Sequence, residues 1–385
     1  MLDANQRSAL AIIRSLGRRG LKVVAGDHHA SSLGAASRYA AESVRYPDPA
    51  TSPDAFVREL TGLAARLAVD TIVPVTDSTT MLLVSQPDLS KFARVAVPAA
   101  LSYETLTDKA RLLELAGRLG IAAPVTEVAE TAAEALNAAH RIGFPVVLKP
   151  GRSRYLKGDR ILSTGVQIVG DPAALTQALQ HQEWLGAIPC LVQQFVPGHG
   201  AGIFSLFGPS GAIAWFAHRR IREKPPAGGV SVLSESVPVD PVMQSATAKL
   251  LGATGWTGVA MVEFRVAGDG TPYLMEVNGR FWGSLQLAID CGVDFPWLLY
   301  QLTHGMTVTP PRPYVVGRRL RWLMGDLDSL IIQLREGSVG PRLNLRAVGA
   351  FLRSFADPAC RQEVCRISDP LPGVREIRQW FGALR

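Results

Sequence analysis

The chain of 385 residues is 47% hydrophobic and 19% charged, and it carries seven net positive charges. This balance is typical of a soluble globular protein of two or three domains, and it argues against disordered and fibrous chains. Because no apolar run approaches the roughly 18 residues that cross a bilayer and the start has no signal-peptide pattern, we expect a cytoplasmic protein.

The first hundred residues alternate helix and strand signals. Helices are predicted over residues 9–16 and 53–67, and strands over 21–25 and 71–75. Such alternation favours a parallel, doubly wound sheet, so we expect a Rossmann-like domain over residues 1–104. Because the first helix signal begins almost at the N-terminus, the first strand of that domain should be nearly absent.

A second module begins with a helix that is predicted to end at Gly120. Thr107 or Asp108 supplies the side-chain oxygen of its N-cap. Apolar strands are then predicted over residues 145–149 and 190–196. The module is therefore expected to contain a sheet of its own.

Basic residues follow the first of these strands. Lys149 ends the strand, and a buried ammonium group there needs an anion. The next loop, residues 151–165, has a single acid, Asp159, against Arg152, Arg154, Lys157 and Arg160. Its glycines let the backbone approach a phosphate, which the cations would neutralise. Two interpretations are open, a lid over a phosphate ligand or a mobile basic surface loop.

A strand predicted over residues 217–222 is also basic. Because side chains alternate along a strand, one face would present Arg219 and the other His218, Arg220 and Arg222. We interpret Arg220 as a phosphate or carboxylate contact, and the backbone N–H groups of Gly228 and Gly229 as candidates to bind a substrate carboxylate. A solvated basic strand is the competing interpretation.

The most informative segment is a hairpin predicted over residues 258–280. If its turn closes four residues, Ala267 faces Pro272, and the same register places Glu263 directly opposite Glu276. The Cβ atoms of opposed residues are about 5 Å apart, a separation at which two carboxylates repel each other unless a cation lies between them.

Further polar groups extend this acidic pair. Asn278 lies two residues beyond Glu276 and so shares its face, and Arg280 continues the same alternation. Carboxylate and amide oxygens are ligands that suit Mg²⁺ shared with phosphate, whereas Arg280 suits bidentate binding of a phosphate group. The alternative is a surface hairpin whose acids only solvate it.

The C-terminal part, residues 306–385, holds most of the net charge. Residues 312–385 contain 13 Arg, no Lys and seven acidic residues. We expect a basic, mainly helical extension. Arginines on the wet faces of helices are the commoner explanation of such charge, so no specific nucleic-acid partner is expected.

The run LMEVNGRFWGS at 274–284 resembles the Mg²⁺-binding signature of the ATP-grasp superfamily. The resemblance covers residues 105–305 and is closest to the carbamoyl-phosphate-synthase-like, predicted carboxylate-amine ligase branch. It implies an α/β and α+β protein whose two-lobed module has a small lobe over 121–196 and a large lobe over 197–305. Gly279 departs from the pattern, since the family usually has Pro there.

The resemblance also implies roles for individual residues. Mg²⁺ or Mn²⁺ would be held by Glu263, Glu276 and Asn278. The transferred phosphoryl group would be stabilised by Arg280 and Arg220, and the substrate would meet Arg280, Gly228 and Gly229. ATP would be bound, besides Glu263 and Glu276, by Lys109, Lys149, Arg154, Gln193, Gln194, Phe195, Val196 and His199.

The implied activity is that of an ATP- and Mg²⁺-dependent ligase that activates a carboxylate as an acyl phosphate, releases ADP and joins the acyl group to an amine. Two alternatives remain open, phosphorylation of bicarbonate or carbamate, and nucleotide-responsive binding of a polyanion without turnover. The expected partners are a small carboxylate, an amine and a second copy of the chain in a homodimer. An acceptor linked to a lipid at a membrane surface is a further alternative.

Overall fold

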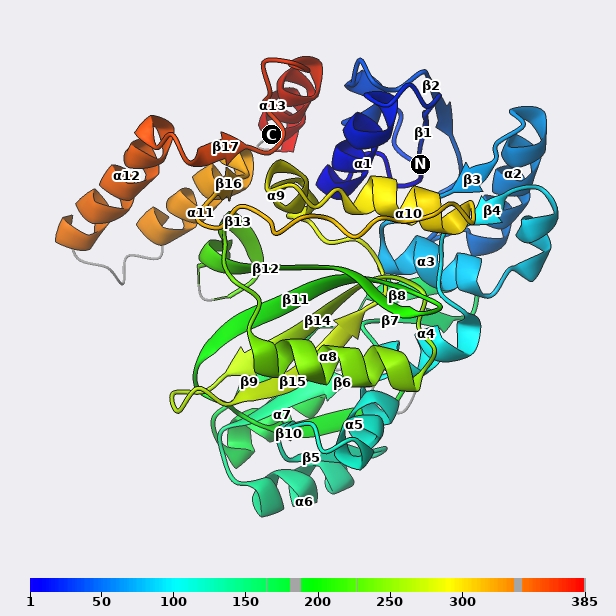
Figure 1. Ribbon diagram of the computed structural model, residues 1–385. Coiled ribbons are helices and arrows are strands. Elements are labelled where there is room, and N and C mark those ends of the chain that lie inside the picture. The colour runs from blue at the N-terminus through cyan, green and yellow to red at the C-terminus, as the bar shows by residue number, and fades with distance from the viewer. Residues whose placement is uncertain (164, 181–187, 227, 336–340, 384–385) are drawn as a thin grey trace.

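The computed structural model describes residues 1–163, 165–180, 188–226, 228–335 and 341–383. Helices and strands are mixed throughout these residues, as expected for an α/β and α+β protein (Figure 1). A seven-stranded sheet forms the centre, and a four-stranded sheet and two short parallel strand pairs lie around it.

Short parallel strands and helices make up the N-terminal part. Its strand pairs are β1 (Val24–Asp27) with β2 (Glu42–Arg45), and β3 (Thr71–Ile72) with β4 (Arg94–Val95). Its helices are α1 (Arg7–Gly17), η1 (Gly34–Ala36), α2 (Pro53–Arg66), α3 (Asp77–Val84), η2 (Pro87–Lys91) and α4 (Ala100–Thr107). The predicted helices and the parallel pairing are confirmed, although each predicted strand is shifted or shorter.

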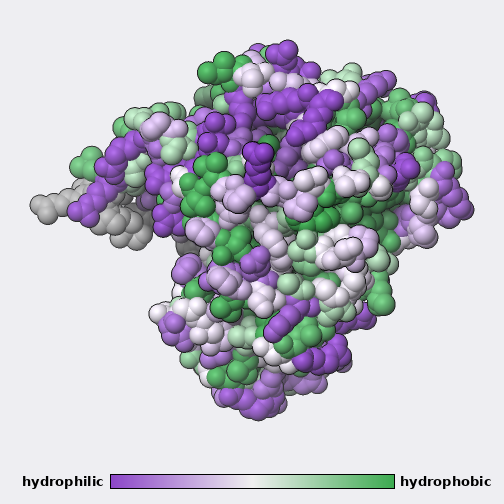
Figure 2. All heavy atoms as spheres, in the orientation of Figure 1, coloured by the Kyte–Doolittle hydropathy of each residue, from purple (hydrophilic) through white to green (hydrophobic). Residues whose placement is uncertain are grey.

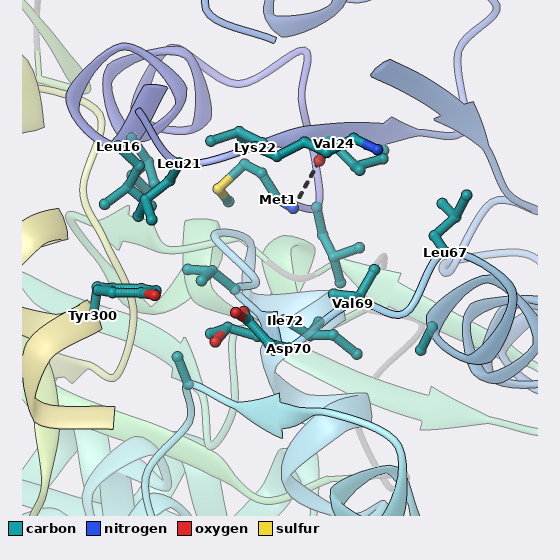
Figure 3. Close-up of a pocket in the computed structure, with 18 of the residues that line it drawn as sticks. Met1, Leu16, Leu21, Lys22, Val24, Leu67, Val69, Asp70, Ile72 and Tyr300 are labelled. Carbon is teal, nitrogen blue, oxygen red and sulfur yellow. Dashed lines mark hydrogen bonds between the residues drawn. The ribbon is translucent and has the colours of Figure 1, made fainter. Parts of the chain in front are cut away.

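The first four residues join the two strand pairs. The Leu2 N–H donates to the Val73 carbonyl at 3.0 Å, and the Met1 carbonyl accepts from the Gly26 N–H at 2.8 Å. An apolar cavity of about 270 Å³ lies beside Met1, between Leu21 and Ile72 (Figure 3). None of the predicted site residues is among the described residues that line this cavity.

An antiparallel four-stranded sheet follows in the chain, in the order β5 (Thr126–Ala129), β10 (Cys190–Gln194), β6 (Val146–Pro150) and β9 (Gln167–Val169). The helices of this part are α5 (Lys109–Arg118), α6 (Ala132–Ile142) and α7 (Pro172–Gln180), and a separate hairpin is formed by β7 (Arg154–Lys157) and β8 (Arg160–Ser163). Buried side chains such as Ala138, Leu148 and Leu175 pack α6 and α7 against the sheet.

The seven-stranded sheet carries the predicted acidic hairpin at one edge. Its order is β15 (Pro272–Asn278), β14 (Gly258–Val266), β11 (His199–Gly208), β12 (Gly211–Lys224), β13 (Val230–Ser236), β16 (Arg319–Arg321) and β17 (Cys360–Gln362). One face packs against α8 (Pro241–Ala253), and the other packs against α1, α9 (Leu285–Asp290) and α10 (Phe295–Thr303).

The C-terminal part is less purely helical than expected. It contains α11 (Leu323–Arg335), α12 (Pro341–Ala356) and α13 (Leu371–Ala383), but β16 and β17 also extend the central sheet. Both strands have three residues, too few to show the alternation that predicts a strand. Among the described residues, every helix is too short or too polar to cross a lipid bilayer.

A buried ion pair ties this C-terminal part to α1. The Arg14 Nε atom donates to Asp369 Oδ2 at 2.9 Å, and both side chains are almost fully buried. Asp369 also accepts hydrogen bonds from the Ser37 hydroxyl and the Arg38 N–H. The C-terminal part is therefore packed onto the N-terminal part.

Replacing Asp369 by Asn should destabilise the protein, because it leaves the Arg14 guanidinium buried without a counter-charge. Loss of one partner of a buried pair costs about 3 kcal/mol or more. Thermal unfolding should therefore show a clearly lower midpoint for Asp369→Asn. The matched control is Asp88→Asn, which removes an exposed pair with Lys91 and should leave the midpoint unchanged. Equal midpoints for the two variants would contradict the structural role of Asp369.

Candidate active site

The two acids of the hairpin lie opposite each other, as predicted. Glu263 of β14 pairs in register with Glu276 of β15. The turn differs from the prediction, because Val266 rather than Ala267 faces Pro272. Met275 is an extra residue in β15, a β-bulge, and it restores the predicted register at the two acids.

Asn278 connects the two carboxylates. Its Nδ2 atom lies 3.0 Å from Glu263 Oε1 and 3.3 Å from Glu276 Oε1, so one oxygen of each acid faces the same amide. Burial and then the charge of Glu276 raise the pKa of Glu263. Two carboxylates and an amide oxygen fit Mg²⁺. Asn278 would present its oxygen after a half-turn of its amide group, which exchanges Oδ1 and Nδ2, two atoms of similar size.

Cationic groups occupy the remaining carboxylate oxygens. Lys109 Nζ lies 3.4 Å from Glu276 Oε2 and donates to the Ser153 hydroxyl at 2.9 Å. Arg220 Nη2 lies 2.8 Å from Glu263 Oε2. Two chain segments far from the hairpin therefore lower the repulsion within the acidic pair.

Lys109 is positioned by the start of α5. The Asp108 side chain caps this helix by accepting from the N–H groups of Ala110 and Arg111, which confirms the predicted N-cap. The Lys109 N–H donates to the Gly151 carbonyl at 3.0 Å. The helix start is thus fixed against the end of β6.

Lys149 lies on β6, the neighbour of β10 in the four-stranded sheet. Its Nζ atom contacts the sulfur of Met275 at 3.7 Å, so the β-bulge of the hairpin touches this lysine. Burial lowers the pKa of Lys149 to about 8, with Glu276 acting in the opposite direction. The ammonium is thus destabilised and would gain from an added anion.

Arg280 is held by a residue that the sequence analysis missed. Its Nε and Nη2 atoms donate to the two carboxylate oxygens of Asp77 at 2.7 and 3.0 Å, a bidentate pair. Nη2 also donates to Asn278 Oδ1 at 3.2 Å. Asp77 is the first residue of α3, just after β3. The sequence could have indicated Asp77 only as an acid that follows the carboxyl end of a parallel strand.

The basic strand β12 divides its arginines differently from the prediction. Ile221 is an extra residue, so Arg222 lies opposite Leu233 while Arg219 lies opposite Glu235. Leu233 and Glu235 share one face of β13, and therefore Arg219 and Arg222 lie on that face, away from Arg220. The prediction that Arg222 shares a face with Arg220 was wrong, because the bulge reverses the alternation.

His218 and the glycine loop lie next to Arg220. His218 is buried, and its Nε2 atom forms a 2.7 Å hydrogen bond with the Ser284 hydroxyl of the signature run. Burial lowers the pKa of His218 to about 3, so the ring is neutral. The Gly229 carbonyl accepts from Arg220 Nη1 at 3.4 Å, while Gly228 has a φ of +133°, which favours glycine.

The predicted nucleotide hinge lies where β10 leads into β11. Gln193 is buried and donates to the Thr126 hydroxyl, whereas Gln194 and His199 are exposed. Phe195 is half-buried, and the Val196 carbonyl accepts from Arg265 Nε at 3.2 Å. Of these five residues, Gln194 and His199 are the ones whose side chains are exposed.

A small cavity brings groups from three parts of the chain together. It has a volume of about 90 Å³, and its lining includes Asp77, Lys109, Arg154, Glu276 and Asn278. Arg154 begins β7 in the predicted lid, and the partner strand β8 touches the N-terminal part through a hydrogen bond from the Ile161 N–H to the Ala50 carbonyl. One position of the predicted lid segment, residue 164, lies outside the described residues.

Part of the chain is similar in sequence to known ligases. A family model described as "ATP-grasp in the biosynthetic pathway with Ter operon" matches residues 189–325. The D-alanine–D-alanine ligase of Anaeromyxobacter dehalogenans is 32% identical over 176 residues, which are 42% of this chain and 54% of that protein. The chain thus spans about half the length of the curated relatives it matches.

Solved structures share the fold at lower identity. The biotin carboxylase domain dimer of Hydrogenobacter thermophilus 2-oxoglutarate carboxylase, in complex with MgADP, ADP and bicarbonate, has a TM-score of 0.65 and 17% identity over 83% of this chain and 72% of that one. L-amino acid ligase from Bacillus licheniformis has a TM-score of 0.60 and 17% identity over 78% of this chain and 73% of that one.

The lowered pKa of Lys149 predicts pH-dependent proton uptake on nucleotide binding. Below about pH 7 the lysine is already protonated, so binding takes up no proton there. Above about pH 8 the free protein has lost that proton, and a bound phosphate group raises the pKa again, so binding takes up a proton. Calorimetry of MgADP binding in buffers of different ionisation enthalpy measures this uptake.

The variant for this test is Lys149→Met, and its matched control is Lys157→Met in the exposed part of β7. We expect the proton uptake above pH 8 to disappear in the first variant and to persist in the second. The same uptake in both variants would show that another group titrates.

Proposed function

We propose that the chain is a member of the ATP-grasp superfamily and acts as an ATP- and Mg²⁺-dependent ligase that phosphorylates a carboxylate and joins the acyl group to an amine. The observation that carries the proposal is the acidic pair, in which Glu263 and Glu276 each direct one oxygen toward Asn278. Two half-buried carboxylates this close repel each other unless cations lie beside them, and such a pair suits a divalent ion shared with phosphate oxygens.

The cations around the pair support phosphoryl transfer. Lys109 and Lys149 approach Glu276 from the side of the four-stranded sheet, where the predicted nucleotide contacts also lie. Arg220 and Arg280 approach from the side of β12 and α3. We place the nucleotide phosphates near the lysines and the substrate carboxylate near the arginines, so that the γ-phosphoryl group lies between the two sets.

In this arrangement the protein supplies charge and position rather than a nucleophile. The bound Mg²⁺ would neutralise the triphosphate oxygens. Arg280, oriented by Asp77, would stabilise the negative charge that develops on the transferred phosphoryl group. The β7–β8 hairpin would cover the acyl phosphate and exclude water, and Arg154 would approach the phosphates from it.

The names of the relatives favour an amine as the second substrate. D-alanine–D-alanine ligase and L-amino acid ligase are both named for joining amino acids. A carboxylate-amine ligase is therefore our first choice for this chain. A homodimer is also a proposal, and the mass of the protein in solution would test it.

Replacing Glu276 by Gln should abolish turnover. The purified protein is given ATP and Mg²⁺ with pools of carboxylates and amines, and ADP, AMP and phosphate are followed. Loss of one metal-binding carboxylate should lower ADP release by about 10²-fold or more while the thermal midpoint stays close to that of the parent. The matched control is Asp269→Asn, an exposed acid in the turn of the same hairpin, which should keep full activity.

Two outcomes would contradict the proposal. Formation of AMP and pyrophosphate would exclude an acyl phosphate, and unchanged ADP release by Glu276→Gln would remove the acidic pair from the reaction. ADP release that depends on bicarbonate alone would instead support the alternative of bicarbonate phosphorylation.

A further inference from the structure

A second hollow lies on the opposite face of β12 from the acidic pair. It has a volume of about 500 Å³ and lies between β12, β16 and α12. Among the described residues that line it, Asp357 is the only acid, and the arginines on this face are Arg219, Arg222, Arg319 and Arg353. Arg220 also borders the hollow, although its guanidinium contacts Glu263 on the other side of the strand. The bulge at Ile221 brings Arg219 and Arg222 to this face together.

The acids around the hollow do not balance its arginines. Arg219 and Arg319 share Glu235, and Arg319 also pairs with Asp357. Arg222 and the buried Arg321 share Asp326. Arg353 is exposed and has no ion pair with any residue that the structure describes. The lining residues Arg219, Arg222, Arg319 and Arg353, together with the buried Arg321, thus have three carboxylates as ion-pair partners among the described residues, which leaves an excess of positive charge.

Contacts with α12 hold two of these groups, those of Arg321 and Arg222. The guanidinium of Arg321 lies 4.1 Å from the ring centre of Phe351 and 4.2 Å from that of Phe355. Its Nη1 and Nη2 atoms have no hydrogen-bond partner among the described residues. Arg222 Nη2 donates to the Ser354 hydroxyl of α12 at 2.9 Å. Arg222 is therefore held in place before any ligand arrives, which lowers the entropy lost on binding.

We propose that this hollow binds the phosphate groups of a phosphorylated ligand, at a site separate from the nucleotide site. Guanidinium groups bind phosphate oxygens in bidentate pairs, and several of them around one concave space suit a diphosphate better than a single carboxylate. This compact, open hollow differs from the extended stripe that tracks a nucleic-acid backbone. Figure 2 shows hydrophilic and hydrophobic residues side by side on the protruding part of the molecule that contains α11 and α12.

Inorganic pyrophosphate is the probe for this site. Calorimetry on the full chain, with MgADP present at saturation to occupy the nucleotide site, should show pyrophosphate binding that weakens as salt rises. Arg353→Gln and Arg219→Gln should each weaken it at least about tenfold, as expected for loss of one charge-assisted contact. Both side chains are exposed, so the fold should persist, and thermal midpoints check this.

The matched control is Arg361→Gln, an exposed arginine on β17 that does not line the hollow. Its affinity for pyrophosphate should equal that of the parent. No measurable binding by the parent, or equal binding by the parent and Arg353→Gln, would overturn the proposal. Because neither variant touches the acidic pair, these results are independent of whether the ligase proposal holds.

Vesicles distinguish a lipid headgroup from a soluble phosphate ester as the source of the ligand. Phosphatidylcholine vesicles with and without phosphatidic acid are sedimented with each protein. Sedimentation that needs both phosphatidic acid and Arg353 would support the site with a lipid as its ligand. Pyrophosphate binding without sedimentation would support it with a soluble ligand. Sedimentation that Arg353→Gln leaves unchanged, without pyrophosphate binding, would refute it.

Discussion

The repulsion between two opposed, half-buried carboxylates is the constraint on which the rest of the site depends. Glu263 and Glu276 face each other across one antiparallel hairpin, where like charges are destabilising. Two cations offset this repulsion, since Lys109 lies beside Glu276 Oε2 and Arg220 beside Glu263 Oε2. The other oxygen of each acid, Oε1, faces the amide of Asn278. A site built this way is ready to exchange an amide contact for a divalent cation.

The same constraint explains why the site needs several distant parts of the chain. The lysine comes from the start of α5, the arginine from the centre of β12, and Arg280 is fixed by Asp77 at the start of α3. The N-terminal part therefore positions Arg280 through Asp77, although it contributes no side chain to the acidic pair. The arginines of β12 lie on both faces of the strand. Arg220 points to the acids, whereas Arg219 and, because of the bulge at Ile221, Arg222 lie on the side of the second hollow.

Sequence reasoning succeeded where a local rule decides the geometry. The predicted register correctly placed Glu263 opposite Glu276, but only because two errors cancelled. The prediction put the turn register off by one residue, and it also missed the extra residue Met275, which shifts the register back by one. The N-cap predicted at Thr107 or Asp108 depends on a local hydrogen bond, and the structure shows it at Asp108. Asp77 and the position of Arg222 were missed because a contact between remote residues and a bulge leave no periodic signal.

The most direct test of the acidic pair is a crystal structure with Mn²⁺ and a non-hydrolysable ATP analogue, in which anomalous scattering locates the metal. We expect the ion between Glu263 and Glu276, with Asn278 turned to present its oxygen and the metal about 2.0–2.2 Å from the carboxylates. A nucleotide bound with the metal elsewhere, or with the two acids turned apart, would contradict this account.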